Sequence, residues 1–112
     1  MSEGRGDALR LSDILRSAGR LEEMLAAGFA SFTGSWQSQS ATIRELEVIG
    51  EAAGEVSDAL RKRHPEIGWV KMRGFSSFAK HEYWRIKPEL VWAAVMEMPA
   101  LRERISRIVS KV

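Results

Sequence analysis

Apolar residues recur at steps of three and four along most of this chain, which is the spacing of one face of an α-helix. The first run covers residues 8–28, and charged side chains fill the positions between its apolar ones, so it predicts an amphipathic helix. Asp7 stands just before this run and is a residue type that caps helix N-termini. Residues 1–7 are rich in glycine and polar side chains, and we expect them to form a flexible N-terminus. The apolar positions of the run are Leu11, Ile14, Leu15, Ala18, Leu21 and Leu25.

A second helical run begins at Ser38 or Ser40, continues to about residue 63, and is predicted to be the longest element. It contains Gly50 and Gly54, and each glycine destabilises a helix by ~1 kcal/mol relative to alanine. Two glycines four residues apart therefore indicate that another helix approaches this one closely.

The rest of the pattern predicts three shorter helices. His64 precedes a proline, and the residue before a proline avoids the helical region, so the second helix is expected to end there. Pro88 and Pro99 each fit the first turn of a helix. No stretch alternates with period two, so the chain is predicted to be an all-α, four- to five-helix antiparallel bundle. The expected ranges are 28–38 for a loop or broken helical continuation, 67–80, 88–97 and 99 onward for helices, 81–87 for a turn or irregular helical end, and 8–112 for a single domain.

Composition narrows the class of protein. Of the 112 residues 29% are charged, and the net charge of +2 is too small to indicate nucleic-acid binding by itself. The absence of cysteine excludes disulfides and cysteine-based metal sites. No His or carboxylate cluster has metal-ligand spacing, so neither a metal nor another cofactor is expected. No apolar run approaches the ~20 residues of a membrane span, and the N-terminus lacks a signal-peptide core, which favours a cytoplasmic protein.

The densest group of reactive side chains follows the third predicted helix. His81, Tyr83, Trp84 and Arg85 lie within five residues, and Tyr83 is the only tyrosine. An imidazole that titrates near neutral pH beside a guanidinium suits phosphate or RNA chemistry. Three roles fit Trp84: a contact in a dimer, a platform for base stacking, or burial in the core.

Four short motifs occur in one order between residues 9 and 110. They are Ile49-Gly50-Glu51-Ala52, Pro65-Glu66-Ile67-Gly68-Trp69, His81-Glu82-Tyr83-Trp84-Arg85-Ile86 and Val91-Trp92. As an ordered set they resemble the HepT-like family of HEPN-domain proteins. The resemblance implies a homodimer that brings catalytic Arg and His residues of both copies into one cleft. It also implies a metal-independent endoribonuclease toxin, silenced by a small nucleotidyltransferase antitoxin that adenylylates the tyrosine at the position of Tyr83.

One position departs from the family pattern. The family carries an Arg-Asn pair that begins seven residues after the motif tryptophan, and this chain has Ser76 and Ser77 there. Either the catalytic arginine is lost and activity is reduced, or Arg73 replaces it, because residues three apart share a helix face. Lys80 and Arg85 are further candidates for the missing positive charge.

Two functions of different classes therefore remain open. In the first, the chain cleaves RNA, with His81 as the base, Arg73 as a phosphate ligand and Glu51 in a polar cleft. Positive charge matters for this reaction because negative charge builds up on the phosphate in the transition state. In the second, the chain is a catalytically silent subunit that dimerises and binds a nucleotidyltransferase or a nucleotide through the same cleft. The residue at position 76 separates the two.

Overall fold

The computed structural model describes residues 3–80 and 87–111, and within those ranges every regular element is a helix. The all-α prediction is therefore confirmed. The elements are α1 (Glu3–Ala27), α2 (Phe29–Thr33), α3 (Trp36–Glu55), α4 (Asp58–Arg63), the 3₁₀ helix η1 (Pro65–Ile67), α5 (Trp69–Lys80), α6 (Pro88–Met96) and α7 (Met98–Val109).

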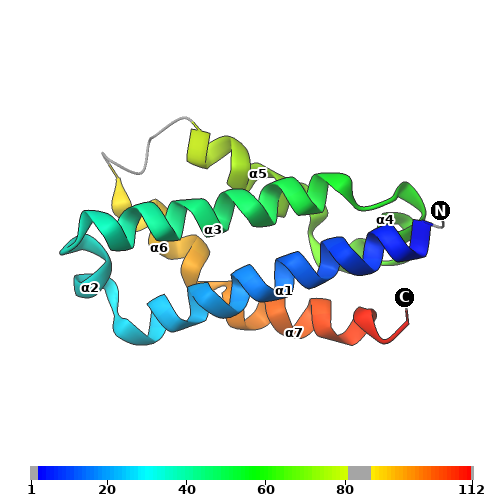
Figure 1. The fold of residues 1–112 in the computed structure, drawn as a ribbon, viewed down its shortest axis with the longest axis horizontal. Helices are drawn as coiled ribbons and strands as arrows, with labels where there is room; N and C mark the ends of the chain where they lie inside the picture. The colour runs from blue at the N-terminus through cyan, green and yellow to red at the C-terminus, as the bar shows by residue number, and fades with distance from the viewer. Residues whose placement is uncertain (1–2, 81–86, 112) are drawn as a thin grey trace.

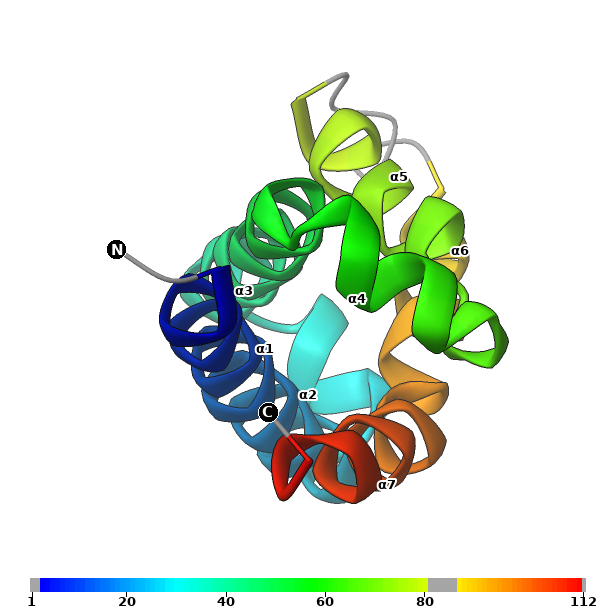
Figure 2. The same ribbon diagram turned by 90° about the vertical axis from the view of Figure 1, so that its right-hand side faces the viewer.

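The long helices form an antiparallel bundle that measures 43 × 26 × 23 Å. α1 and α3 run side by side in opposite directions along its long axis, with α2 at one end and α4 at the other (Figure 1). α5 packs along α3, and α7 packs along α1. Viewed end-on, α1, α3, α5, α6 and α7 surround a common centre (Figure 2).

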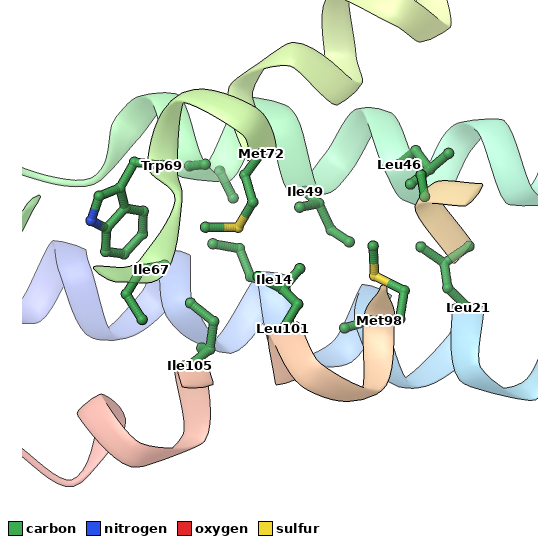
Figure 3. Packing of buried hydrophobic residues seen from close by; sticks show 14 of the residues in the cluster. Ile14, Leu21, Leu46, Ile49, Ile67, Trp69, Met72, Met98, Leu101 and Ile105 are labelled. Atoms are coloured by element: carbon green, nitrogen blue, oxygen red, sulfur yellow. The ribbon is translucent and has the colours of Figure 1, made fainter. Parts of the chain in front are cut away.

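The predicted apolar stripes meet in that centre. Leu11, Ile14, Ala18 and Leu21 of α1 are buried, as the helical spacing predicted. Figure 3 shows side chains of α1, α3, α5 and α7 converging on one core. Its labelled residues are Ile14, Leu21, Leu46, Ile49, Ile67, Trp69, Met72, Met98, Leu101 and Ile105. Burial of such aliphatic side chains at ~25 cal/mol per Å² is the main stabilising contribution to a helical bundle.

The start of the first helix differs from the prediction. α1 begins at Glu3, five residues earlier than expected, so Asp7 lies inside the helix and does not cap it. Asp7 is buried, and its carboxylate accepts hydrogen bonds from the backbone N–H of Ser57 at 2.8 Å and from the Ser57 hydroxyl at 2.6 Å. The local pattern could not show this role because the donors lie 50 positions further along the chain.

The second predicted helix is two helices. Ser57 interrupts it, because this residue is extended and its hydroxyl accepts from the backbone N–H of Leu60 at 3.2 Å, which caps α4. α3 also begins earlier than expected, at Trp36, where Ser35 caps it by accepting from Ser38. α1, with 25 residues, is therefore the longest described helix.

The connections are more helical than predicted. Residues 29–33 form α2, whose Phe32 is fully buried and stacks on Trp92 with ring centroids 5.7 Å apart. Gly68 has a left-handed φ of 82° and separates η1 from α5, so the third predicted helix starts two residues late. Trp69 is buried, and its indole N–H donates to the backbone carbonyl of His64 at 2.9 Å. The fourth predicted helix ends at Met96, one residue early, and the fifth begins at Met98, also one residue early.

Candidate functional site

At Gly50, the backbones of α3 and α5 approach each other with no side chain of α3 between them. Gly50 of α3 is buried, and a Cβ atom placed on it would lie 2.4 Å from the backbone nitrogen of Ser76 and 2.7 Å from its Cβ. Those separations are too short for any real side chain, so Gly50 is required for the two backbones to approach. The close approach predicted from Gly50 and Gly54 is thus confirmed, and the approaching helix is the one that carries Arg73 and Ser76.

An open pocket of about 500 Å³ lies beside this crossing. Three glycines contribute bare backbone to it, so much of its surface has no side chains. Glu51 and Glu55, one helical turn apart, line it from α3, and α5 contributes the guanidinium of Arg73. The full lining is Gly50, Glu51, Gly54, Glu55, Val70, Arg73, Gly74 and Ser76.

Charges of both signs are arranged around the pocket. Arg10 of α1 lies 3.2 Å from Oε2 of Glu55, and Arg44 lies 4.0 Å from Oε1 of Glu51. Both carboxylates also line a smaller neighbouring pocket of about 200 Å³ that contains the two arginines. Arg10 therefore links Glu55 to α1, whereas Arg44 belongs to α3 and makes its closer contact with Glu47, at 2.6 Å.

Arg73 of α5 lies against α3 at Gly54, in the pocket that Glu51 and Glu55 also line. A Cβ atom added to Gly54 would come within 3.7 Å of its Nε, so the guanidinium passes over bare backbone. Among the residues that the structure describes, no carboxylate lies within ion-pair distance of Arg73. The hydroxyl of Ser76 donates to the backbone carbonyl of Arg73 at 3.0 Å, within the same helical turn. The pocket therefore combines one cation, Arg73, with two carboxylates, Glu51 and Glu55.

The structure brings some of the predicted site residues together and leaves others apart. Glu51, Arg73 and Ser76 share the pocket. Ser77 and Lys80 are exposed on α5 and do not line it. His81, Tyr83, Trp84 and Arg85 lie outside the described residues.

The sequence pattern did not single out two of the side chains that line the pocket, those of Glu55 and Val70. Glu55 follows Glu51 by one helical turn, a spacing that places both on one face, so periodicity could have identified it. The Val70 side chain lines the pocket and is 83% exposed, which is a high exposure for a branched aliphatic residue. Nothing in its local sequence distinguishes it from a buried valine of an amphipathic helix.

Comparison with known proteins identifies the family. A model of the family described as "Ribonuclease HepT-like" matches residues 14–108. This chain belongs to the HepT-like ribonuclease family. The resemblance drawn from the ordered motifs is thus confirmed.

Relatives match over most of their length. A protein named "Probable ribonuclease HepT" from Thermococcus cleftensis is 30% identical over 100 residues, which covers 88% of this chain and 91% of that protein. A "Putative RNase" from Methanocaldococcus jannaschii is 31% identical over 97 residues, covering 85% and 89%. Another, from Caldanaerobacter subterraneus subsp. tengcongensis, is 26% identical over 92 residues, covering 81% and 82%. No solved structure matches the chain.

The described residues contain neither a cluster suited to a metal ion nor a helix suited to a membrane. No group of three or more His, Asp or Glu side chains gathers there in a way that could hold a metal ion. None of the described helices is both long enough and apolar enough to cross a bilayer.

Proposed function

We propose that this HepT-like protein is a metal-independent endoribonuclease in which Arg73 takes the place of the family's arginine. The observation that carries the proposal is that Arg73 and Ser76 line the same pocket, so a guanidinium is available where the expected one is missing. Gly54 supports this role because its lack of a side chain leaves room for the guanidinium against α3. The family and the names of the relatives support an RNA substrate.

The proposed reaction uses the 2′-hydroxyl of the RNA as the nucleophile. His81 accepts the hydroxyl proton, and the 2′ oxygen attacks the adjacent phosphorus. The bond from phosphorus to the 5′ oxygen breaks, and that oxygen takes up a proton from solvent. The products are a 2′,3′-cyclic phosphate and a free 5′-hydroxyl. Arg73 stabilises the charge that accumulates on the phosphate oxygens, a contribution of about 3 kcal/mol for a well-placed donor.

Moving the positive charge from position 73 to position 76 tests this assignment. Arg73→Ala is expected to lower the RNA cleavage rate by about 100-fold because it removes the only described cation of the pocket. Ser76→Arg in the same background is expected to restore part of the rate, since residue 76 lines the same pocket as residue 73. Lys80→Ala is the matched control, as Lys80 lies on the same helix but outside the pocket, and its rate should not change. A neutral Arg73→Ala together with a faster Ser76→Arg would show instead that the arginine role is vacant.

A catalytically silent subunit is the second candidate, and the two carboxylates favour it. Glu51 and Glu55 share the pocket with Arg73 and oppose the entry of a phosphate. In that case the chain dimerises and binds a nucleotidyltransferase or a nucleotide without cleaving RNA. Two results together would support this second function. The purified wild-type protein would leave every RNA intact, and the Ser76→Arg variant would also show no cleavage.

We propose that the protein assembles as a homodimer through the region of residues 73–92. Val70, one turn before that region, is 83% exposed, and a small domain has little apolar surface to leave in water. The open pocket fits this arrangement, because an open site gains walls when a second copy covers it. Phe75, which lies in the same region, is half-buried and packs against the core of its own chain.

We further propose that Tyr83 is adenylylated by a small nucleotidyltransferase acting as the antitoxin, with this chain as the toxin of a cytoplasmic pair. Tyr83 is the only tyrosine, so a modification of a phenol has no other target in the chain. Its position two residues after His81 would place an added phosphate beside the proposed base. The negative charge and bulk of the nucleotide would then exclude RNA without unfolding the domain.

Native mass spectrometry tests the dimer and the modification together. The untreated protein is expected at the mass of two chains. After incubation with ATP and a nucleotidyltransferase encoded beside it, the mass should rise by one or more AMP units, and Tyr83→Phe should abolish the increase. A single-chain mass at tens of micromolar would refute the dimer, and a label that persists in Tyr83→Phe would refute the modification site.

A further inference from the structure

We infer that the pocket between α3 and α5 is a base-recognition subsite that selects guanine in single-stranded RNA. This inference rests on the proposed ribonuclease function and adds to it a sequence preference. It starts from an unexplained feature: a site that must bind a polyanion contains two acidic side chains, Glu51 and Glu55. Carboxylates disfavour phosphate but are good acceptors for the N–H groups of a nucleobase.

The shape of the pocket suits a flat heterocycle. Its volume of about 500 Å³ lies within the range of small-molecule sites, which is ~300–1,000 Å³. Gly54 of α3 and Gly74 of α5 are exposed and line the pocket, so a ring can approach the backbone at these positions because neither presents a side chain. Val70 stands at the rim with 83% of its surface exposed, and it offers an apolar contact to one face of the ring. A pocket built only for a phosphate would need neither feature.

The acceptors distinguish guanine from the other RNA bases. Glu51 and Glu55 lie one turn apart on the same wall, and their side chains are 56% and 62% exposed. Guanine presents two adjacent donors, N1–H and the N2 amino group, which match the two oxygens of one carboxylate. Uracil presents a single N–H between two carbonyl oxygens, and a carboxylate repels those oxygens. Adenine and cytosine place a ring acceptor beside their amino group, so each offers one donor where guanine offers two.

The surrounding arginines make the acidic wall compatible with RNA. Arg10 and Arg44 each lie beside one oxygen of a carboxylate, Oε2 of Glu55 and Oε1 of Glu51 respectively. Both arginines offset part of the negative charge, and the hydrogen bond from Arg10 orients the Glu55 carboxylate, which reduces the entropy lost when a base binds. Arg73 lines the same pocket, where it can hold a phosphate of the nucleotide whose base contacts α3.

Binding of short oligonucleotides to the His81→Ala protein tests the inference without turnover. Three fluorescein-labelled hexamers are compared by anisotropy: oligouridine, the same sequence with one guanosine, and the same with inosine, which lacks the N2 amino group. The guanosine hexamer is expected to bind about 10-fold more tightly than oligouridine, with inosine between them. In Glu51→Gln/Glu55→Gln, the ratio of the two affinities should fall to about one.

The ratio is the decisive quantity because removing two negative charges raises the affinity for every RNA. Glu47→Gln is the matched control: Glu47 lies on α3 one turn before Glu51, pairs with Arg44, and does not line the pocket. That variant should keep the preference for guanosine. Equal binding of all three hexamers by the parent protein would overturn the inference and leave the ribonuclease proposal intact. If wild-type protein neither binds nor cleaves any RNA, both fall.

Discussion

His81→Ala is expected to abolish RNA cleavage by the purified protein, with a rate loss of at least about 100-fold. The reason is that an imidazole titrates near neutral pH and can accept the 2′-hydroxyl proton, whereas alanine cannot. No shift in helix content is expected on circular dichroism, because residue 81 follows Lys80, the last residue of α5, and so lies outside the described helices. The measurement is the initial rate of cleavage of a labelled single-stranded RNA.

His64→Ala provides the matched control for this experiment. His64 is the only other histidine, and it lies between α4 and η1, outside the pocket. Its side chain contacts Glu66, with Nδ1 3.5 Å from the carboxylate, and this contact has no part in the proposed reaction. Cleavage should therefore survive in this variant. Equal activity of His81→Ala and wild type would place the reaction on another residue or in a contaminant.

Asp7→Ala should be among the most destabilising substitutions of a polar residue in the chain, lowering the free energy of unfolding by about 3 kcal/mol. The variant removes the acceptor for both the backbone N–H and the hydroxyl of Ser57. Asp7 is only 4% exposed, so water cannot readily replace its carboxylate. Losses of this size lower the melting temperature of a domain of this length by on the order of 10 °C. Thermal unfolding followed by circular dichroism measures the change.

Two further variants separate the buried hydrogen bonds from general effects on α1. Asp7→Asn keeps one acceptor oxygen and should lose less stability than Asp7→Ala. Glu23→Ala changes an exposed acidic residue of the same helix and is expected to alter stability by less than about 0.5 kcal/mol. If Asp7→Ala were no more destabilising than Glu23→Ala, the hydrogen bonds to Ser57 would contribute little.

The contact between Asp7 and Ser57 also bears on the site. Ser57 stands where α3 ends and α4 begins, and the chain then turns through η1 into α5. α5 in turn carries Arg73 and Ser76. Because the α3–α4 junction determines where the returning chain meets α3, we expect Asp7→Ala to weaken RNA binding as well as stability, even though Asp7 does not line the pocket.

The sequence by itself determined the all-α class, the approximate ranges of most helices and the family. These features depend on neighbours close along the chain: the three- and four-residue spacing of Leu11, Ile14 and Ala18 places them on one face whatever the rest of the protein does. The close approach at Gly50 was also predictable, because Gly50 and Gly54 destabilise their own helix and stand four residues apart, which indicates that another helix packs against them. The order of the motifs was likewise visible without coordinates, and the family comparison confirms what it indicated.

Only the tertiary structure decided which distant residues meet. Asp7 has the sequence signature of a helix cap, but its donors belong to Ser57, and no local pattern contains both. The interruption of the second predicted helix follows from that contact together with the cap at Ser57. Arg73 shares a pocket with Glu51 and Glu55 because α5 returns along α3, and the side chains that converge come from helices separated by two short elements. Helical periodicity determines the face on which a residue lies, whereas the crossing of two helices determines what that face contacts.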